Sequence, residues 1–145
     1  MAITRNDPGT IWLGGPRTEV GDAAASAAIT PGHLLLRFNN GGIWRVKKHD
    51  SAAANAVRLV ATEQSMLNMT VDDDYAAGDL VEASELAGGS SAWMFVASGQ
   101  TIVYGDLLES AGDGTLRKLN AGVALFSALE SKTALALTRI RVETV

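Results

Sequence analysis

Glycines separate short apolar runs along almost the whole chain, and this spacing restricts the fold more than any other feature of the sequence. There are 15 glycines among 145 residues. Short apolar runs bounded by turn residues are typical of all-β domains. The sequence therefore predicts an all-β fold. We expect strands at residues 10–13, 34–38, 43–46, 57–62, 80–83, 93–97, 101–103, 116–119, 123–129 and 135–145.

The strand pattern is clearest in two segments. In "LLLRFNNGGIWRVK", two apolar runs flank Asn-Asn-Gly-Gly, which can supply the positive φ angles that a tight hairpin turn requires. The final segment, "ALALTRIRVETV", also alternates. Leu135 and Leu137 are out of phase with Ile140 and Val142, and a β-bulge near Thr138 would explain the shift.

Two alanine-rich segments leave helix and strand open as alternatives, because alanine favours helices. Neither "GDAAASAAIT" nor "SAAANAVRLVATEQ" carries a sustained apolar stripe at helical spacing. We interpret the first as a linker or a short helix. For the second we favour a loop at 51–55 followed by a strand, with a helix as the alternative.

The first 29 residues differ in composition from the rest. Small and polar residues surround one apolar group, "IWL". We expect residues 1–29 to form an N-terminal arm or linker, with a possible edge strand at 10–13. Residues 30–145 are then a single β-domain, which is a common domain size. An exposed tryptophan is a frequent binding anchor, so Trp12 is a candidate interface residue.

Charge is distributed unevenly around the net value of −4. Residues 63–113 contain ten acidic residues and no lysine or arginine, whereas 31–62 and 116–145 are each predominantly basic. The acidic segment supplies a solvated face, or acidic and basic patches meet between copies or on a partner.

No dense basic cluster with stacking aromatics indicates nucleic acid. No apolar run is long enough for a membrane span, and no signal layout begins the chain, so we expect a soluble, non-secreted protein.

Glycine is followed directly by aspartate at several places, which raises the possibility of a metal or phosphate site. Asp79, Asp106 and Asp113 each follow a glycine directly. The spacing matches neither a calcium loop nor a phosphate-binding loop, and "DDDYAAGD" has acids without calcium-loop spacing. Glycine provides positive φ and aspartate bonds its own turn backbone. We therefore predict β-turns, with no cofactor and no metal.

The sequence offers little for catalysis. Cysteine is absent, so there is no thiolate nucleophile, no disulfide and no zinc–sulfur site. The histidines, His33 and His49, occur without a G-x-S-x-G elbow or a recognisable triad. We predict that the protein is not an enzyme, and a hydrolase that uses either histidine is the weakest alternative.

Several motifs in order resemble the capsid decoration, or cement, proteins of tailed bacteriophages. They are "AITPGHLLL", "KKHDSAAANAVRLVATEQ", "DDDYAAGDLVEA", "ASGQTIVYGDLLESAGDGTL", "NAGVALFSALE" and "ALTRIRVETV". The resemblance runs from about residue 10 to the C-terminus. It implies a small β-barrel or β-sandwich, SH3-like or β-tulip-like, without enzymatic activity. It also implies a homotrimer on the outer surface of an HK97-type phage head, made in the host cytoplasm, which clamps neighbouring major capsid protein subunits.

The resemblance does not assign individual contact residues, so the partner-binding set comes from the pattern of the sequence. It consists of Ile3, Ile11, Trp12, Leu13, Arg45, Lys47 and Lys48. The first four lie in the arm, where an apolar segment could dock or add a strand to a partner. The alternative function is a phage tail or baseplate module, or a host-glycan binder. Trp93, which follows "GGSS", is then the candidate sugar platform.

Overall fold

The computed structural model describes residues 8–145, and the chain there is all-β with one 3-10 turn, η1 (Ser65–Leu67). This confirms the predicted fold class. The strands are β1 (Trp12–Gly14), β2 (Arg17–Val20), β3 (Ala24–Ala25), β4 (Leu35–Asn40), β5 (Ile43–Lys48), β6 (Leu59–Ala61), β7 (Ala83–Leu86), β8 (Ser91–Val96), β9 (Thr101–Ile102), β10 (Leu107–Ser110), β11 (Leu116–Lys118), β12 (Phe126–Ala128), β13 (Lys132–Thr133) and β14 (Thr138–Thr144).

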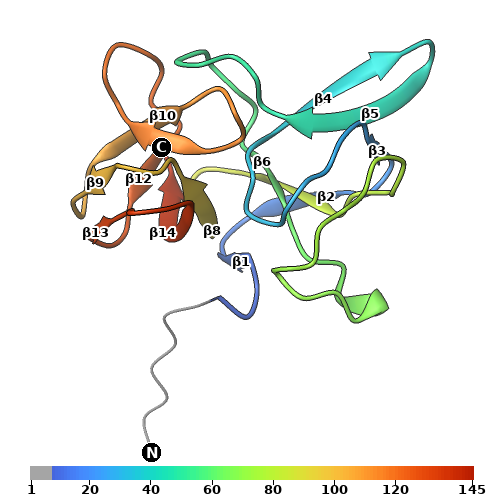
Figure 1. Ribbon diagram of the computed structural model, residues 1–145, viewed down its shortest axis with the longest axis horizontal. Coiled ribbons are helices and arrows are strands. Elements are labelled where there is room, and N and C mark those ends of the chain that lie inside the picture. Colours follow the sequence, from blue (N-terminus) through green and yellow to red (C-terminus); the bar gives the residue numbers. More distant parts are fainter. Residues whose placement is uncertain (1–7) are drawn as a thin grey trace, which may run out of the picture.

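Five strands close a small barrel, in the order β8-β11-β10-β12-β14 and back to β8 (Figure 1). The closing pair, β8 with β14, is antiparallel, and it places Ile140 opposite Met94. Both side chains are fully buried, as are Leu108 and Phe126. Successive side chains of a strand point to opposite faces. One set of alternate residues of β8 and β14 therefore fills the barrel, and the other set forms its outer wall.

A second lobe lies beside the barrel and has its own core. Its two three-stranded sheets have the orders β2-β7-β6 and β3-β5-β4. Ile29, Leu35, Val46 and Tyr75 are among the residues that make up this core. The β4–β5 hairpin projects from this lobe, away from the barrel (Figure 1).

Hydrogen bonds and a shared core join the lobe to the barrel. The amide of Leu34 donates to the carbonyl oxygen of Gly114 (2.8 Å), and the amide of Phe95 donates to that of Gly32 (3.1 Å). Leu34 and Val60 from the lobe belong to the same apolar cluster as the barrel interior. The two cores therefore meet along the base of the hairpin.

The hairpin is confirmed, with Asn40 opposite Ile43. Gly41 and Gly42 have φ angles of 61° and 87°, which fits the predicted tight turn. The segment after Ser51 contains no helix among the described residues, and β6 follows it, as favoured.

The C-terminal strand begins at Thr138, later than expected. Leu135 is 88% exposed and Leu137 is 51% exposed, so they belong to the connection after β13 rather than to a core-facing strand. The phase shift in the sequence therefore marks the start of a strand, and the expected β-bulge is not needed.

The expected N-terminal boundary needs a correction. Strand β1 occupies nearly the predicted edge position and pairs with β8. However, β2 and β3 pair with β7 and β5, and Ala25 and Ile29 are buried in the second core. Residues 17–29 are consequently part of the fold and not of an arm.

Candidate partner-binding surfaces

The Gly-Asp steps that end at Asp79, Asp106 and Asp113 form turns. Asp79 accepts a hydrogen bond from the amide of Ala76 (2.8 Å), and Asp106 accepts one from the amide of Val103 (2.8 Å). The carboxylate of Asp113 accepts from the amide of Thr115 (3.0 Å). The Val103 amide and, to a smaller extent, Lys118 hold the pKa of Asp106 below its usual value. These aspartates stabilise their own turns.

The acidic run in the second lobe is also tied to its surroundings. Asp72 pairs with Arg139 (2.9 Å), Asp73 accepts from the amide of Thr70, and Asp74 accepts from the hydroxyl of Thr30. Within residues 8–145, no group of three or more His, Asp or Glu side chains is placed to hold a metal ion. The same part of the chain contains no helix long and apolar enough to cross a bilayer.

The two histidines are buried at the junction between the lobe and the barrel. Nδ1 of His33 accepts a hydrogen bond from the amide of Thr30 (3.1 Å), and its ring centre lies 4.8 Å from that of Phe95. Nδ1 of His49 lies 2.7 Å from Oγ of Ser110, which has no exposed surface. Both imidazoles therefore make structural contacts in positions that solvent scarcely reaches.

The apolar group near the N-terminus is divided between core and surface. Ile11 has no exposed surface, so its prediction as a partner contact is wrong. Its amide and the hydroxyl of Thr10 both donate to the carboxylate of Glu63. Leu13 is 41% exposed, and Ile3 lies outside the described residues. The carboxylate of Glu63 thus fastens the segment directly before β1.

Trp12 is partly buried. Its ring lies 4.0 Å from the guanidinium of Arg17, and its indole Nε1 is buried without a hydrogen-bond partner among residues 8–145. A shallow hollow of about 330 Å³ adjoins it, with Glu63 and the strongly exposed Met66 in its wall. Trp12 and Leu13 therefore border a surface that a partner could cover.

The three basic residues predicted as contacts lie on β5, but they do not share a face. Arg45 and Lys47 point to the same side as Phe38, because Phe38 is opposite Arg45 in the strand pair. Lys48 points to the other side, where its Cβ and Cγ pack close to Gly114. The structure thus brings Arg45 and Lys47 together and gives Lys48 a packing role.

Sequence reasoning missed the exposed apolar residues of the hairpin. Ile43 is 57% exposed and Trp44 is 44% exposed. The guanidinium of Arg37 lies 4.5 Å from the centre of the Trp44 ring. Both residues directly follow the Gly-Gly turn. This position indicates exposure, because the turn end of a hairpin can extend beyond the core.

Trp93, the candidate sugar platform, is only 6% exposed. It lies on the outer wall of the barrel, and the guanidinium of Arg141 is 5.3 Å from its ring centre. A sugar could not stack on this indole unless Arg141 moved. The residue that motivated the glycan-binding alternative is therefore unsuitable for it.

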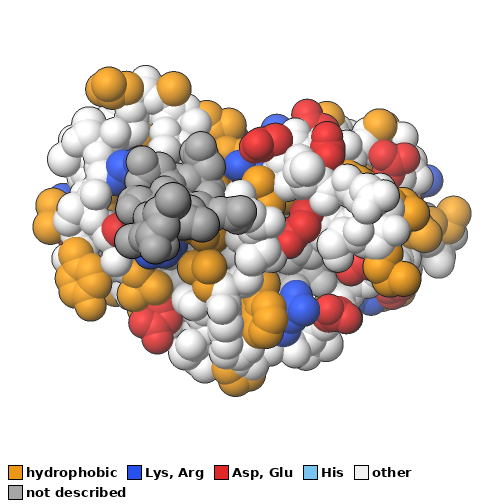
Figure 2. Space-filling model, turned by 90° about the horizontal axis from the view of Figure 1, so that it is seen from below, with side chains coloured by type: hydrophobic (Ala, Val, Ile, Leu, Met, Phe, Trp, Pro, Cys, Tyr) orange, Lys and Arg blue, Asp and Glu red, His pale blue; other side chains and the backbone are white. Residues whose placement is uncertain are grey.

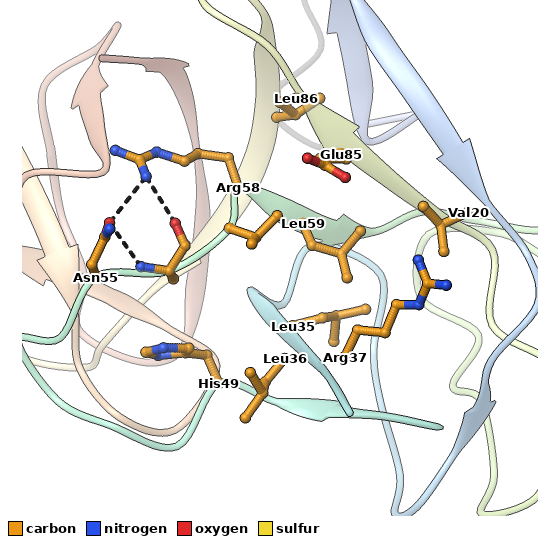
Figure 3. Close-up of a pocket in the computed structure, with 12 residues that line it drawn as sticks. Val20, Leu35, Leu36, Arg37, His49, Asn55, Arg58, Leu59, Glu85 and Leu86 are labelled. Atoms are coloured by element: carbon orange, nitrogen blue, oxygen red, sulfur yellow. Dashed lines mark hydrogen bonds between the residues drawn. The ribbon is translucent and has the colours of Figure 1, made fainter. Parts of the chain in front are cut away.

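A cavity of about 650 Å³ opens between the base of the hairpin and β6 (Figure 3). Leu35, Leu36 and His49 form one wall, and Glu85 and Leu86 form part of another. Arg58 is held at the side by its own neighbours. Its guanidinium donates to Oδ1 of Asn55 (3.1 Å) and to the carbonyl oxygen of Ala56 (2.8 Å).

The surface around Trp12 and Leu13 and the tip of the β4–β5 hairpin face different directions. Figure 1 shows β1 and the tip of the β4–β5 hairpin on opposite sides of the molecule. Figure 2, seen from the β1 side, shows Asp and Glu side chains gathered on the half of that face away from the barrel. Contacts at these two regions would therefore involve different parts of a partner assembly.

The comparisons with known proteins support a likeness of fold. No protein-family model and no curated protein matches the sequence. Among solved structures, the chain is similar to the N base of the head fiber protein gp8.5 of bacteriophage phi29. The TM-score is 0.59 at 15% sequence identity, and the match covers 90% of this chain and 98% of that one. The likeness therefore extends through both the barrel and the second lobe.

Proposed function

We propose that this chain is a structural protein of a phage virion that attaches to the outer surface of the head. The observation that carries the proposal is the fold match to a head fiber base, which covers 98% of that chain. The resemblance of the sequence motifs to capsid decoration proteins points to the same location independently. The proposed role requires no catalysis, cofactor, nucleic acid or membrane.

In this proposal the protein bridges major capsid protein subunits as a homotrimer. Each copy adds a modest contact area, and several linked contacts dissociate far more slowly than one. Bridging contacts that form only on the assembled head stabilise the head by mass action. The heads should then resist heat and low ionic strength better with the protein than without it.

On the β1 side, the proposed contacts are Ile3, Trp12 and Leu13. Ile11 is excluded because it is a core residue. A truncation that tests this arm should end before Thr10, because Thr10 and Ile11 are fastened by Glu63. Removal of residues 1–9 should lower head binding and leave the melting temperature nearly unchanged. Undiminished binding would remove the arm from the proposal.

The decisive experiment is co-sedimentation of the purified protein with expanded heads that lack it, quantified as copies per head. Saturable binding at a multiple of three copies per capsid unit supports a trimeric head-binding protein. Saturation at another ratio contradicts the trimer, and absence of binding to both expanded and unexpanded heads contradicts the head-surface role. Heads incubated with the variant Lys132→Glu, on β13, serve as a control for nonspecific charge effects.

A further inference from the structure

We propose that the outward face of the β4–β5 hairpin docks onto an acidic surface of the shell protein. This inference rests on the proposed function and names the chemistry of the partner surface. The outward face is defined as Leu36, Phe38, Ile43, Arg45 and Lys47. Trp44 and Arg37 lie on the other side of the same strand pair and support its tip.

Strand register brings the five side chains of the outward face together. Leu36 is opposite Lys47, Phe38 is opposite Arg45, and Ile43 is opposite Asn40. Residues directly opposite in an antiparallel pair point to the same face. The face therefore alternates apolar and cationic groups, and Lys47 Nζ lies 5.2 Å from the centre of the Phe38 ring.

The charge of the hairpin opposes that of the molecule. Residues 34–49 contain four lysines and arginines and no acid, while the whole chain carries −4, so the remainder carries −8. A cationic projection on a strongly anionic body meets an acidic surface with the hairpin first, because the body is repelled. Complementary charge of this kind raises the association rate and fixes orientation.

The cations Arg37, Arg45 and Lys47 can form ion pairs with a partner. Arg45 makes no ion pair with any residue from 8 to 145. Lys47 pairs with Asp50 (2.7 Å) and Arg37 with Asp22 (3.0 Å), and both carboxylates are half exposed. Exposed pairs contribute little free energy, so carboxylates of a partner can replace them.

The hairpin is also preorganised. Six residue pairs hold its strands, and Oδ1 of Asn39 accepts a hydrogen bond from the amide of Gly42 (2.8 Å) at the turn. The stacked Arg37 supports Trp44 from the side. A rigid contact element loses less conformational entropy on binding than a flexible loop does. The exposed Ile43, the unpaired Arg45 and the rigid strand pair together favour docking over a purely structural role.

The test compares four single substitutions in the full chain, with binding to expanded heads measured at 50 and 500 mM NaCl. Arg45→Glu should lower the association constant at least tenfold at low salt, and Ile43→Ser should lower it severalfold at both salt concentrations. Arg45→Lys should retain most of the affinity. Lys132→Glu makes the same change of charge on β13 and should have little effect. Urea unfolding of each variant confirms that its fold is unchanged.

A second arm separates failure of this inference from failure of the proposed function. Poly-L-glutamate and duplex DNA are used as probes of acidic protein and nucleic acid, and sedimentation velocity reports self-association. Failure of wild type to bind heads would contradict the proposed function. The inference about the hairpin then stands only if wild type and Lys132→Glu bind poly-L-glutamate and Arg45→Glu does not.

Three results would overturn the inference. Arg45→Glu and Ile43→Ser could both bind heads as wild type does, which would remove the face from the interface. Tighter binding to DNA than to poly-L-glutamate would reassign it to nucleic acid. Loss of self-association in Arg45→Glu, with head binding of the separated copies unchanged, would make it a contact between copies.

Discussion

The backbone amide of Gly122 donates a hydrogen bond of 2.7 Å to Oε2 of Glu109, a carboxylate with no solvent exposure. The other oxygen of the same carboxylate accepts from Nε of Arg117 at 3.0 Å. Glu109 is therefore the buried link between β10, β11 and the loop before β12. A Cβ on Gly122 would overlap Oε2 of Glu109 and the carbonyl oxygen of Ala53.

Gly122→Ala should destabilise the protein by about 1–3 kcal/mol, because overpacking against backbone and a fixed carboxylate forces local rearrangement. Urea unfolding measures the change. Gly88→Ala is the matched control, since a Cβ there meets nothing within 4 Å. Equal effects of the two substitutions would show that the loop around Gly122 can relax.

Arg117→Met should cost about 3 kcal/mol of unfolding free energy, because it leaves the charge of Glu109 buried without its cation. The double variant Arg117→Met, Glu109→Leu should recover part of that loss, since it removes the charge as well. A double-mutant cycle in urea gives the coupling free energy. Additive losses would contradict an interaction between the two side chains.

Arg139→Met should loosen the contact between the lobe and the barrel and cost about 2–4 kcal/mol, since buried carbonyl groups lose their donor. The Arg139 guanidinium donates to Pro31 and Val71 and lies 4.5 Å from the centre of the Phe95 ring. Exchange of the Phe95 amide with deuterium should accelerate.

Arg141→Met is the control for this prediction, on the same strand. Arg141 also lies over an aromatic ring of β8, but its side chain is 50% exposed against 9% for Arg139. Its loss should cost less than about 1 kcal/mol. If the two variants were equally stable, the contact of Arg139 with the second lobe would contribute no net free energy.

Stability should fall as the pH is lowered from about 6.5 to about 4. Burial, with a smaller contribution from Lys48, lowers the pKa of His33 from 6.5 to about 4. The unfolded chain then binds more protons than the folded one in this range, so acid favours unfolding. The shift corresponds to about 3 kcal/mol at most.

The comparison variant for this pH dependence is His33→Gln, which keeps a hydrogen-bond acceptor for the amide of Thr30. Urea unfolding at pH 7, 5.5 and 4.5 should give a shallower pH profile for the variant than for wild type. Parallel profiles would assign the acid sensitivity to carboxyl groups instead. The variant also shows whether the imidazole is needed for folding.

Local patterns in the sequence predicted the parts of the fold that depend on local chemistry. The Asn-Asn-Gly-Gly turn fixed the β4–β5 hairpin, and glycine-aspartate steps marked turns at Asp79, Asp106 and Asp113. The barrel closure was not predictable in this way. It depends on β8 meeting β14, and nothing in "SAWMFV" or "TRIRVET" specifies one partner among several apolar strands.

The dependence on strand pairing also explains why some residues were wrongly predicted as buried or exposed. Ile11 and Leu13 look alike as apolar residues in a polar segment, and only the pairing of β1 with β8 decides which one is buried. Trp44 looks like a core residue, and only the length of the hairpin beyond the second core exposes it. Strand alternation alone predicts that Arg45 and Lys48, three positions apart, point to opposite faces. Both residues were nevertheless grouped in one predicted contact set.

The barrel strands come from one continuous stretch of chain, 91–144, whose first and last strands are neighbours in space. An open four-strand precursor would expose two unpaired edges and apolar residues of the barrel interior. Such intermediates are poorly populated, so formation of the ring is a concerted event. The slow amide protons of β8, β10 and β14 should consequently exchange together through one opening reaction, whereas the projecting hairpin exchanges on its own.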